Sequence, residues 1–178
     1  ACPFGHPRPR NGREAPPNQV EGTPEKHVVI QNLTVTGSVN AASEFSVYSG
    51  YVAGVVGSAR NAELSNVISR VNVTADEKVG NVASVGGLAG AMIDTTVTNC
   101  GNEGDVTGVN NLGGLCYELY SGTMTGCYNT GRITATGTYV GGLMGYAKQA
   151  TITNAYSTGD VTTEKTLVGG LIGGEAKK

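Results

Sequence analysis

Histidine, cysteine and carboxylate side chains are the residues of this sequence best suited to chemistry, and the histidines are the scarcest. His6 and His27 are the only two, and both lie near the N-terminus. No serine or cysteine of the remaining chain therefore has a histidine that would activate it as a nucleophile. No His-Glu-x-x-His motif, no cysteine pair with zinc spacing and no Gly-Gly-x-Gly-x-Asp calcium repeat occurs. The sequence predicts a protein that is not an enzyme and that needs no metal and no cofactor.

The cysteines and several charged residues recur at a fixed interval instead. Cys100 and Cys127 are 27 residues apart, and so are Asp105 and Arg132, while Asp160 follows Arg132 by 28. A stacked Asp–Arg–Asp row compensates charge between neighbouring strands and is not an acid–base pair. The interval itself indicates a repeat in which equivalent residues stack.

Composition narrows the class of protein. The 178 residues include 39% hydrophobic and only 15% charged residues, with 28 glycines, no tryptophan and a net charge of −2. The glycine content, together with abundant valine and threonine, disfavours helices. No basic cluster suited to nucleic acid is present, and no apolar run reaches the ~18 residues that span a membrane. We expect neither nucleic-acid binding nor a membrane span.

Two short motifs alternate along the chain. The first is rich in glycine and is clearest at residues 85–90, Val-Gly-Gly-Leu-Ala-Gly. The second has apolar residues at its first, fourth and tenth positions and is clearest at residues 152–162. Its third position is Asn or Gly, which tolerate a left-handed turn. Copies of the first motif begin at Val52, Val85, Leu112, Val140 and Val168, and copies of the second begin at Ile30, Leu64, Val97, Met124 and Ile152.

The spacing of these motifs predicts the fold. The step from the first motif to the second is always 12 residues, whereas the return step is 22, 21, 15, 16 or 16 residues. The full period settles at 27–28 residues. This period suits one coil of a β-solenoid, whose equivalent residues stack at the ~4.8 Å spacing of paired strands. We predict an all-β protein in which residues 28–178 form a β-solenoid of about five coils, with the paired glycines at tight bends.

The N-terminal segment differs from the rest of the chain. All six prolines lie within residues 1–24, and residues 1–27 contain few aliphatic residues. Such a segment buries too little apolar surface to fold alone. We predict an extended proline-rich arm over residues 1–27.

The glycine-rich motif resembles the GLUG repeat, named for Gly-Leu-hydrophobic-Gly, of bacterial surface proteins. The resemblance covers about residues 52–173 and is closest in the Gly-Gly-Leu-x-Gly segments 86–90, 141–145 and 169–173. Tyr117 replaces the last glycine of one copy, and Ala53 and Val55 depart from the pattern in another. The resemblance implies a secreted or surface-displayed bacterial protein, of the kind found among adhesins and in accessory regions of immunoglobulin A peptidases. It implies no catalytic activity for the repeat itself.

The four cysteines allow two disulfide bonds. Cys100 and Cys127 occupy one motif position in successive coils, so we expect them to be neighbours, either bridged or as two buried thiols. Cys116 occupies a core position of the first motif. Cys2 lies in the arm, where it can pair with Cys116 or with another chain.

The order of the motifs predicts an assembly. The chain begins with a second motif at Ile30 and ends with a first motif at Val168, so each end lacks the half coil that the other carries. We expect copies to stack head to tail into an extracellular filament, with the arm strapping neighbours and Cys2 able to lock them. The expected interface consists of Ile30, Leu33, Val39, Val168, Leu171 and Ile172.

Two other functions fit the same pattern. The chain can be a stalk or a ligand-binding module of a cell-surface adhesin, in which Phe45, Tyr48 and Tyr51 of a long return loop form a face for a host or glycan ligand. An ice-binding solenoid is the remaining interpretation, because Thr-x-Thr recurs at 96–98, 123–125 and 151–153. Threonine is also a good strand residue on a solvated face.

Overall fold

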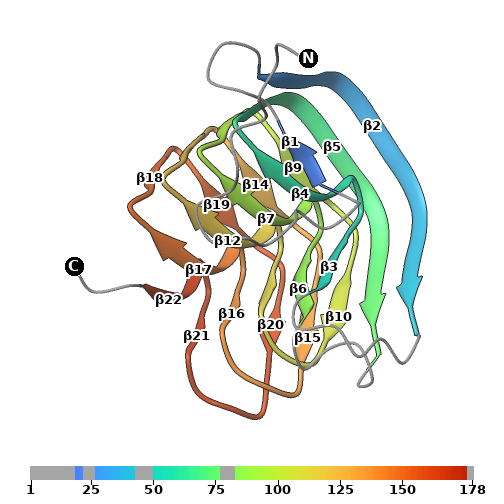
Figure 1. Cartoon of the computed structure of the whole chain (residues 1–178). Helices are drawn as coiled ribbons and strands as arrows, with labels where there is room; N and C mark the ends of the chain where they lie inside the picture. The colour runs from blue at the N-terminus through green and yellow to red at the C-terminus, as the bar shows by residue number, and fades with distance from the viewer. Residues whose placement is uncertain (1–18, 22–26, 43–49, 77–82, 176–178) are drawn as a thin grey trace, which may run out of the picture.

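The structure is a computed structural model, and it describes residues 19–21, 27–42, 50–76 and 83–175. Every regular element within these ranges is a β-strand. The strands form three parallel sheets that wind around a common core, and the chain passes from sheet to sheet at each corner (Figure 1). The prediction of an all-β solenoid is confirmed.

The six-stranded sheet contains one strand from each coil and one from the N-terminal segment. Its order is β1-β4-β7-β12-β17-β22. These strands are β1 (Gln19–Glu21), β4 (Val56–Arg60), β7 (Ala89–Ile93), β12 (Cys116–Tyr120), β17 (Met144–Lys148) and β22 (Ile172–Glu175). The five-stranded sheet lies beside it and contains β3 (Gly50–Ala53), β6 (Ala83–Gly86), β11 (Leu112–Gly113), β16 (Val140–Gly141) and β21 (Val168–Gly169).

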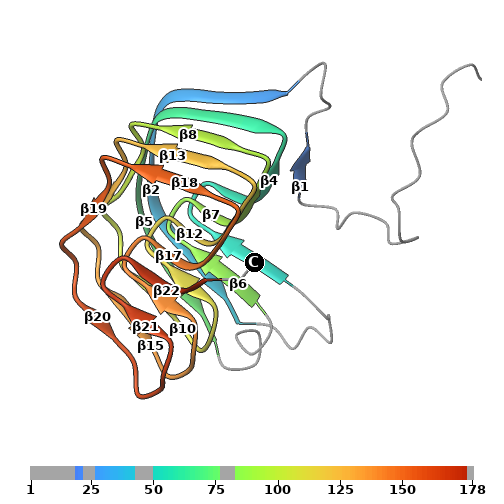
Figure 2. The same ribbon diagram turned by 90° about the vertical axis from the view of Figure 1, so that its left-hand side faces the viewer.

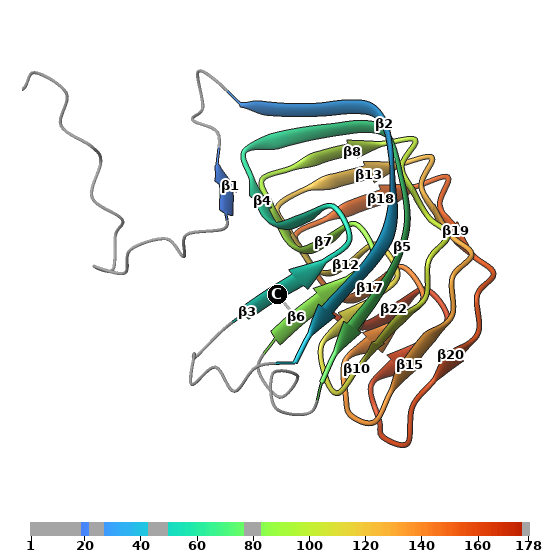
Figure 3. The same ribbon diagram turned by 90° about the vertical axis from the view of Figure 1, so that its right-hand side faces the viewer.

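The eleven-stranded sheet forms the opposite wall. In the first two coils it consists of the long, bent strands β2 (Val28–Ala41) and β5 (Ala62–Ala75) (Figure 3). In later coils the same path is divided into short strands. These are β8 (Thr96–Thr98), β9 (Gly101–Asn102), β10 (Val106–Gly108), β13 (Thr123–Thr125), β14 (Tyr128–Asn129), β15 (Ile133–Ala135), β18 (Thr151–Thr153), β19 (Tyr156–Ser157) and β20 (Val161–Thr162).

The strand register stacks equivalent motif positions on one another. Leu112 pairs with Val85 on one side and with Val140 on the other. Met124 pairs with Val97 and with Ile152 in the same way. Successive coils are therefore related by the 27–28-residue period of the sequence.

Left-handed residues form the corners of the coil. The third position of the second motif has positive φ in every copy, from 51° at Asn154 to 66° at Gly126. Asparagine and glycine adopt this conformation at the lowest cost, so the predicted turn is confirmed. Two further corner rows have no shared residue type: Asn61, Asp94, Ser121 and Gln149 form one, and Asn111, Tyr139 and Leu167 form the other.

The paired glycines allow a bend that no side chain would fit. A Cβ atom on Gly113 would meet the carbonyl oxygen of Cys116 in the same turn. A Cβ atom on Gly114 would meet the backbone of Gly142 and the side chain of Asn129. The first glycine therefore permits the tight bend, and the second permits close approach of the next coil.

A buried polar row runs through the core beside these glycines. Asn102 and Asn129 are completely buried, and the Asn102 amide donates to Asn129 Oδ1 over 2.8 Å. Each amide also donates to a carbonyl oxygen of its own coil, Asn102 to Gly104 and Asn129 to Gly131. Ser69 and Ser157 occupy the same motif position in the flanking coils. The row satisfies buried amides while tying one coil to the next.

The described part of the N-terminal segment pairs with the solenoid. Residues Gln19–Glu21 of the predicted arm form β1, which pairs with Ser58–Arg60 of β4 (Figure 3). The arm is therefore attached to its own chain here, which the proline content did not predict. Residues 1–18 and 22–26 lie outside the described part of the chain.

Candidate functional site

Two places on the solenoid have unusual exposure or chemistry. One is the terminal coil, defined here as residues 151–175, together with β2 at the other end of the stack. The other is a tyrosine cluster on the six-stranded sheet, made of Tyr117, Tyr139 and Tyr146 around Glu118.

The terminal coil exposes residues that are buried elsewhere. Val168 is 47% exposed and Leu171 is 37% exposed, whereas Val140 and Leu143, one coil earlier, are both at 0%. Ile172 is half-buried over fully buried Met144. The inward-facing side chains of this coil are therefore covered on one side only.

Strand β2 is the corresponding surface at the opposite end (Figure 1). Ile30, Leu33 and Val39 are half-buried, whereas their partners on β5 are fully buried. Among the described strands, β2 pairs with β5 alone. The structure thus divides the six predicted interface residues between the two ends of the stack, and the association of these ends stays a prediction.

The cysteines of the core are free thiols. Cys100, Cys116 and Cys127 are all buried, and none of them is bridged. Cys100 and Cys127 are neighbours as predicted, since the Cys100 backbone N–H donates to Cys127 Sγ over 3.4 Å. Burial raises the pKa of the Cys116 thiol, which keeps it protonated and unreactive. Cys2 lies outside the described residues.

We expect these three thiols to resist modification while the protein is folded. In a Cys2→Ala variant, Ellman's reagent should label almost no thiol in native buffer and three per chain in denaturant, because the buried sulfurs become accessible only on unfolding. Rapid labelling of native protein, or fewer than three thiols in denaturant with the missing ones restored by reductant, would contradict free buried thiols.

The tyrosine cluster brings together residues from three strands or corners. The rings of Tyr117 and Tyr146 are stacked with centroids 6.3 Å apart, and Tyr139 meets Tyr146 edge-on at 6.1 Å. Gly145 makes the arrangement possible, because a Cβ atom there would lie 2.6 Å from Tyr117 Cδ2. The sequence did not predict that these three rings converge.

Glu118 lies within the cluster with an incompletely satisfied carboxylate. It makes no hydrogen bond and no ion pair to any residue that the structure describes. Burial raises the pKa of Glu118, while the charges of Lys148 and Arg60 act in the opposite direction. Burial and the Glu118 charge raise the pKa of Tyr117 to about 12. The cluster therefore holds a partly desolvated acceptor beside aromatic rings.

The raised pKa of Glu118 gives a test by pH. Because the folded state disfavours the ionised carboxylate, this group should favour unfolding above its folded pKa and should stop doing so as pH falls below its ordinary value. We expect Glu118→Gln to raise the melting temperature at pH 7 and to change it little at pH 4. An equal shift at both pH values would rule out ionisation as the cause.

Of the three residues of the predicted ligand face, the structure describes Tyr51. Tyr51 is half-buried, and both burial and the Glu118 charge raise its pKa, so it belongs with the tyrosine cluster. Phe45 and Tyr48 lie outside the described residues. The candidate site residues that the sequence did not reveal are thus Glu118 and the three clustered tyrosines.

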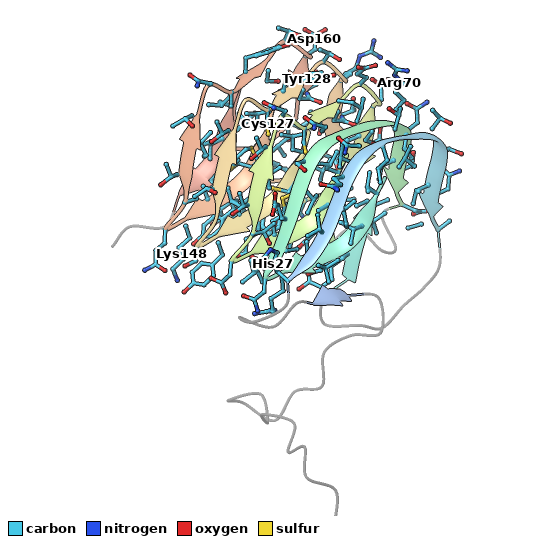
Figure 4. The ribbon with its side chains drawn as sticks, turned by 90° about the horizontal axis from the view of Figure 1, so that it is seen from above. His27, Arg70, Cys127, Tyr128, Lys148 and Asp160 are labelled. Atoms are coloured by element: carbon cyan, nitrogen blue, oxygen red, sulfur yellow. The ribbon has the colours of Figure 1, made fainter. Side chains whose placement is uncertain are left out.

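A second aromatic pair lies on the far side of the solenoid. Tyr128 and Tyr156 stack with centroids 5.6 Å apart, and Tyr128 donates to Glu103. Arg70 also donates to Glu103, over 2.7 Å. Here the carboxylate is fully engaged, unlike that of Glu118. Figure 4 shows Tyr128 and Arg70 on the opposite side of the ribbon from Lys148.

The threonines form the expected ranks. Strands β8, β13 and β18 lie side by side (Figure 2), and Thr123 pairs with Thr96 and Thr151. Neighbouring hydroxyls are 3.0 Å apart between Thr125 and Thr153. Three ranks make a small surface, and we expect no thermal hysteresis in a nanolitre osmometer. Hysteresis that rises with protein concentration would instead support ice binding.

The Asp–Arg–Asp row serves the backbone. The Asp105 carboxylate accepts a hydrogen bond from the Arg132 backbone N–H, over 2.9 Å, and Asn72 accepts one from the Asp105 N–H. The side chains of Asp105 and Asn72 therefore tie neighbouring coils together through bonds to the backbone. Within the described ranges, no group of histidine, cysteine and carboxylate residues could hold a metal ion, and no helix is long and apolar enough to cross a membrane.

Residues 136–162, which run from the turn before β16 through β20, match the family model for the GLUG motif. The chain contains a GLUG motif. The register stacks the neighbouring copies of the first motif on this one, with Leu112 and Val168 flanking Val140. No curated protein and no solved structure matches the sequence. GLUG repeats occur in secreted and surface proteins of bacteria.

Proposed function

We propose that this protein is a non-enzymatic structural subunit of an extracellular bacterial filament, in which the terminal coil of one copy stacks against β2 of the next. One observation carries the proposal. Side chains at identical motif positions are at 0% exposure in the inner coils, whereas Val168 and Leu171 of the terminal coil are 47% and 37% exposed. A second copy would cover them as each inner coil covers its neighbour.

The two surfaces match in register. Ile30, Leu33 and Val39 occupy the positions of Ile152, Ala155 and Val161, so β2 would continue the rows of the terminal coil. Both surfaces also have unpaired strand edges among the described residues, which are natural templates for a further parallel strand. A contact of this kind does not close on itself and extends into a fibre.

The corners support the same geometry. Asn66 donates to Asn32 Oδ1 over 2.9 Å within one chain. Asn32 and Asn154 both adopt left-handed φ values, 56° and 51°. Asn154 of one copy would thus face Asn32 of the next as Asn32 faces Asn66.

The arm contributes in part to this proposal. Strand β1 already extends the six-stranded sheet of its own chain, and its free edge would meet β22 of a neighbour. Strapping by residues 1–18, and locking through Cys2, are the remaining elements of the proposal and lie outside the described residues.

Association can be measured by sedimentation velocity over a range of concentrations. The unmodified protein should form large species as concentration rises, and Leu171→Asp should stay monomeric, because a charge would be buried in the new contact. Thr107→Asp adds the same charge to an exposed position of β10, away from both ends, and should assemble normally. Monomeric protein at every concentration, or equal behaviour of the two variants, would contradict the proposal.

A second candidate function is a ligand-binding module of a cell-surface adhesin. The observation that favours it is the convergence of three tyrosines near the carboxylate of Glu118, which has no hydrogen-bond partner among the described residues. This function is compatible with stacking, since the tyrosine cluster is formed by β12, β17 and the corner before β16, and not by the terminal coil or β2.

A further inference from the structure

The tyrosine cluster has features that coil packing alone does not require. The positions of Tyr117 and Tyr146 are filled by glycine or alanine in the coil before: Gly90 takes the place of Tyr117, and Ala91 takes that of Glu118 and Tyr146. Gly90 and Ala91 are fully buried and the solenoid closes normally there. Large aromatic side chains are therefore an addition to the fold in this part of the sheet.

Glu118 is the polar centre of the cluster. Its carboxylate is partly desolvated, yet it receives no hydrogen bond from any described residue. A desolvated acceptor without a donor is costly, and a ligand that supplies donors recovers that cost. Tyr51, Tyr117, Tyr139 and Tyr146 are all half-buried, so each ring keeps a part of its surface open.

The charges around the cluster select among ligands. The positive charges of Arg60 and Lys148 already stabilise the ionised Glu118 carboxylate. A cationic ligand at this carboxylate would be repelled by them. Lys148 lies 5.2 Å from the centre of the Tyr120 ring and is engaged there. An anionic ligand would be repelled by the negative charge of Glu118 itself. A neutral molecule with hydroxyl donors and apolar faces satisfies both the carboxylate and the rings.

We infer that the tyrosine cluster binds neutral saccharides, with hydroxyl groups donating to Glu118 and the sugar faces packing against Tyr117 and Tyr146. Sites of this kind combine aromatic contact with a few placed polar groups. The inference does not depend on filament formation, because the cluster is complete within one chain.

Affinity electrophoresis tests the inference directly. Native gels containing dextran, glycogen, mannan, laminarin or hydroxyethyl cellulose should retard the protein in at least one case, relative to a gel without polysaccharide. Glu118→Gln and Tyr146→Ala should each reduce that retardation at least fivefold. Tyr128→Ala is the matched control, because it removes one ring of the stacked Tyr128–Tyr156 pair on the other side of the solenoid.

Each outcome has a definite meaning. Retardation that is lost in the two cluster variants and kept in Tyr128→Ala supports the site, provided that the melting temperature of Glu118→Gln shows the protein to be folded. The inference is overturned by no retardation in any of the five gels, by retardation that survives both cluster substitutions, or by equal loss in Tyr128→Ala. Absence of saccharide binding would leave the concentration-dependent sedimentation of the protein unchanged. The electrophoresis therefore tests the saccharide site separately from filament formation.

Discussion

Replacing Leu143 with alanine should lower the free energy of unfolding by about 2–5 kcal/mol. Leu143 is completely buried at the centre of the first motif, where its backbone also bonds to Leu171 of the next coil. Removal of its side chain leaves a cavity between coils that are held by backbone pairing and cannot collapse easily. Urea denaturation followed by far-ultraviolet circular dichroism measures the change.

Leu171→Ala is the matched control for this substitution. Leu171 occupies the same motif position and is 37% exposed, so its truncation removes less buried surface from the monomer. We expect a clearly smaller loss, measured at a concentration below the onset of association. Equal losses at the two positions would mean that the terminal coil is covered within the monomer.

Gly142→Val should destabilise the protein more severely than ordinary overpacking, which costs about 1–3 kcal/mol. A Cβ atom there would meet the Gly170 carbonyl oxygen and would lie 2.5 Å from Ser157 Oγ and 2.9 Å from Ser157 Cβ. The obstacle includes backbone, so two coils must separate to relieve it. We expect loss of cooperative unfolding or of soluble expression.

Gly170→Val separates folding from assembly. Gly170 is the equivalent residue of the terminal coil, and a Cβ atom there would meet nothing within 4 Å. The variant should therefore fold with near-normal stability. In a stacked copy the same side chain would meet the incoming coil, so high-mass species should disappear. A variant that folds and still assembles would argue against this contact.

The periodic part of the structure was open to prediction from the sequence. Positions such as Leu112, Val140 and Asn154 recur at fixed spacing because one backbone path is repeated, and each copy must fill the same core or corner. The 27–28-residue period predicted this coil. The structure confirms the solenoid, the left-handed corner and the close approach at the paired glycines.

The features that break the repeat were not predictable in the same way. Tyr117 is the sixth residue of its motif copy, Tyr146 is the seventh of the next copy, and Tyr139 precedes that copy. Tyr117 and Tyr146 lie on paired strands of one sheet and Tyr139 lies at a corner, so their convergence depends on the chain path from that corner into the sheet, for which the motif spacing has no signal. Strand β1 is missed for a related reason, since Gln19–Glu21 carries neither motif and gains its structure from the free edge of β4.

Stacking of the terminal coil on β2 is tested most directly by position-specific cross-linking between two variants that both lack Cys2. Gln31 is in register with Ser65, and the same row continues through Thr98 and Thr125 to Thr153. A Gln31→Cys protein mixed with a Thr153→Cys protein should therefore form a mixed disulfide dimer on mild oxidation, because stacked Cα atoms lie in the disulfide range of ~4.4–6.8 Å. The matched partner Thr151→Cys lies two residues out of register and should give little dimer. Equal yields from the two mixtures, or no dimer from either, would contradict head-to-tail stacking.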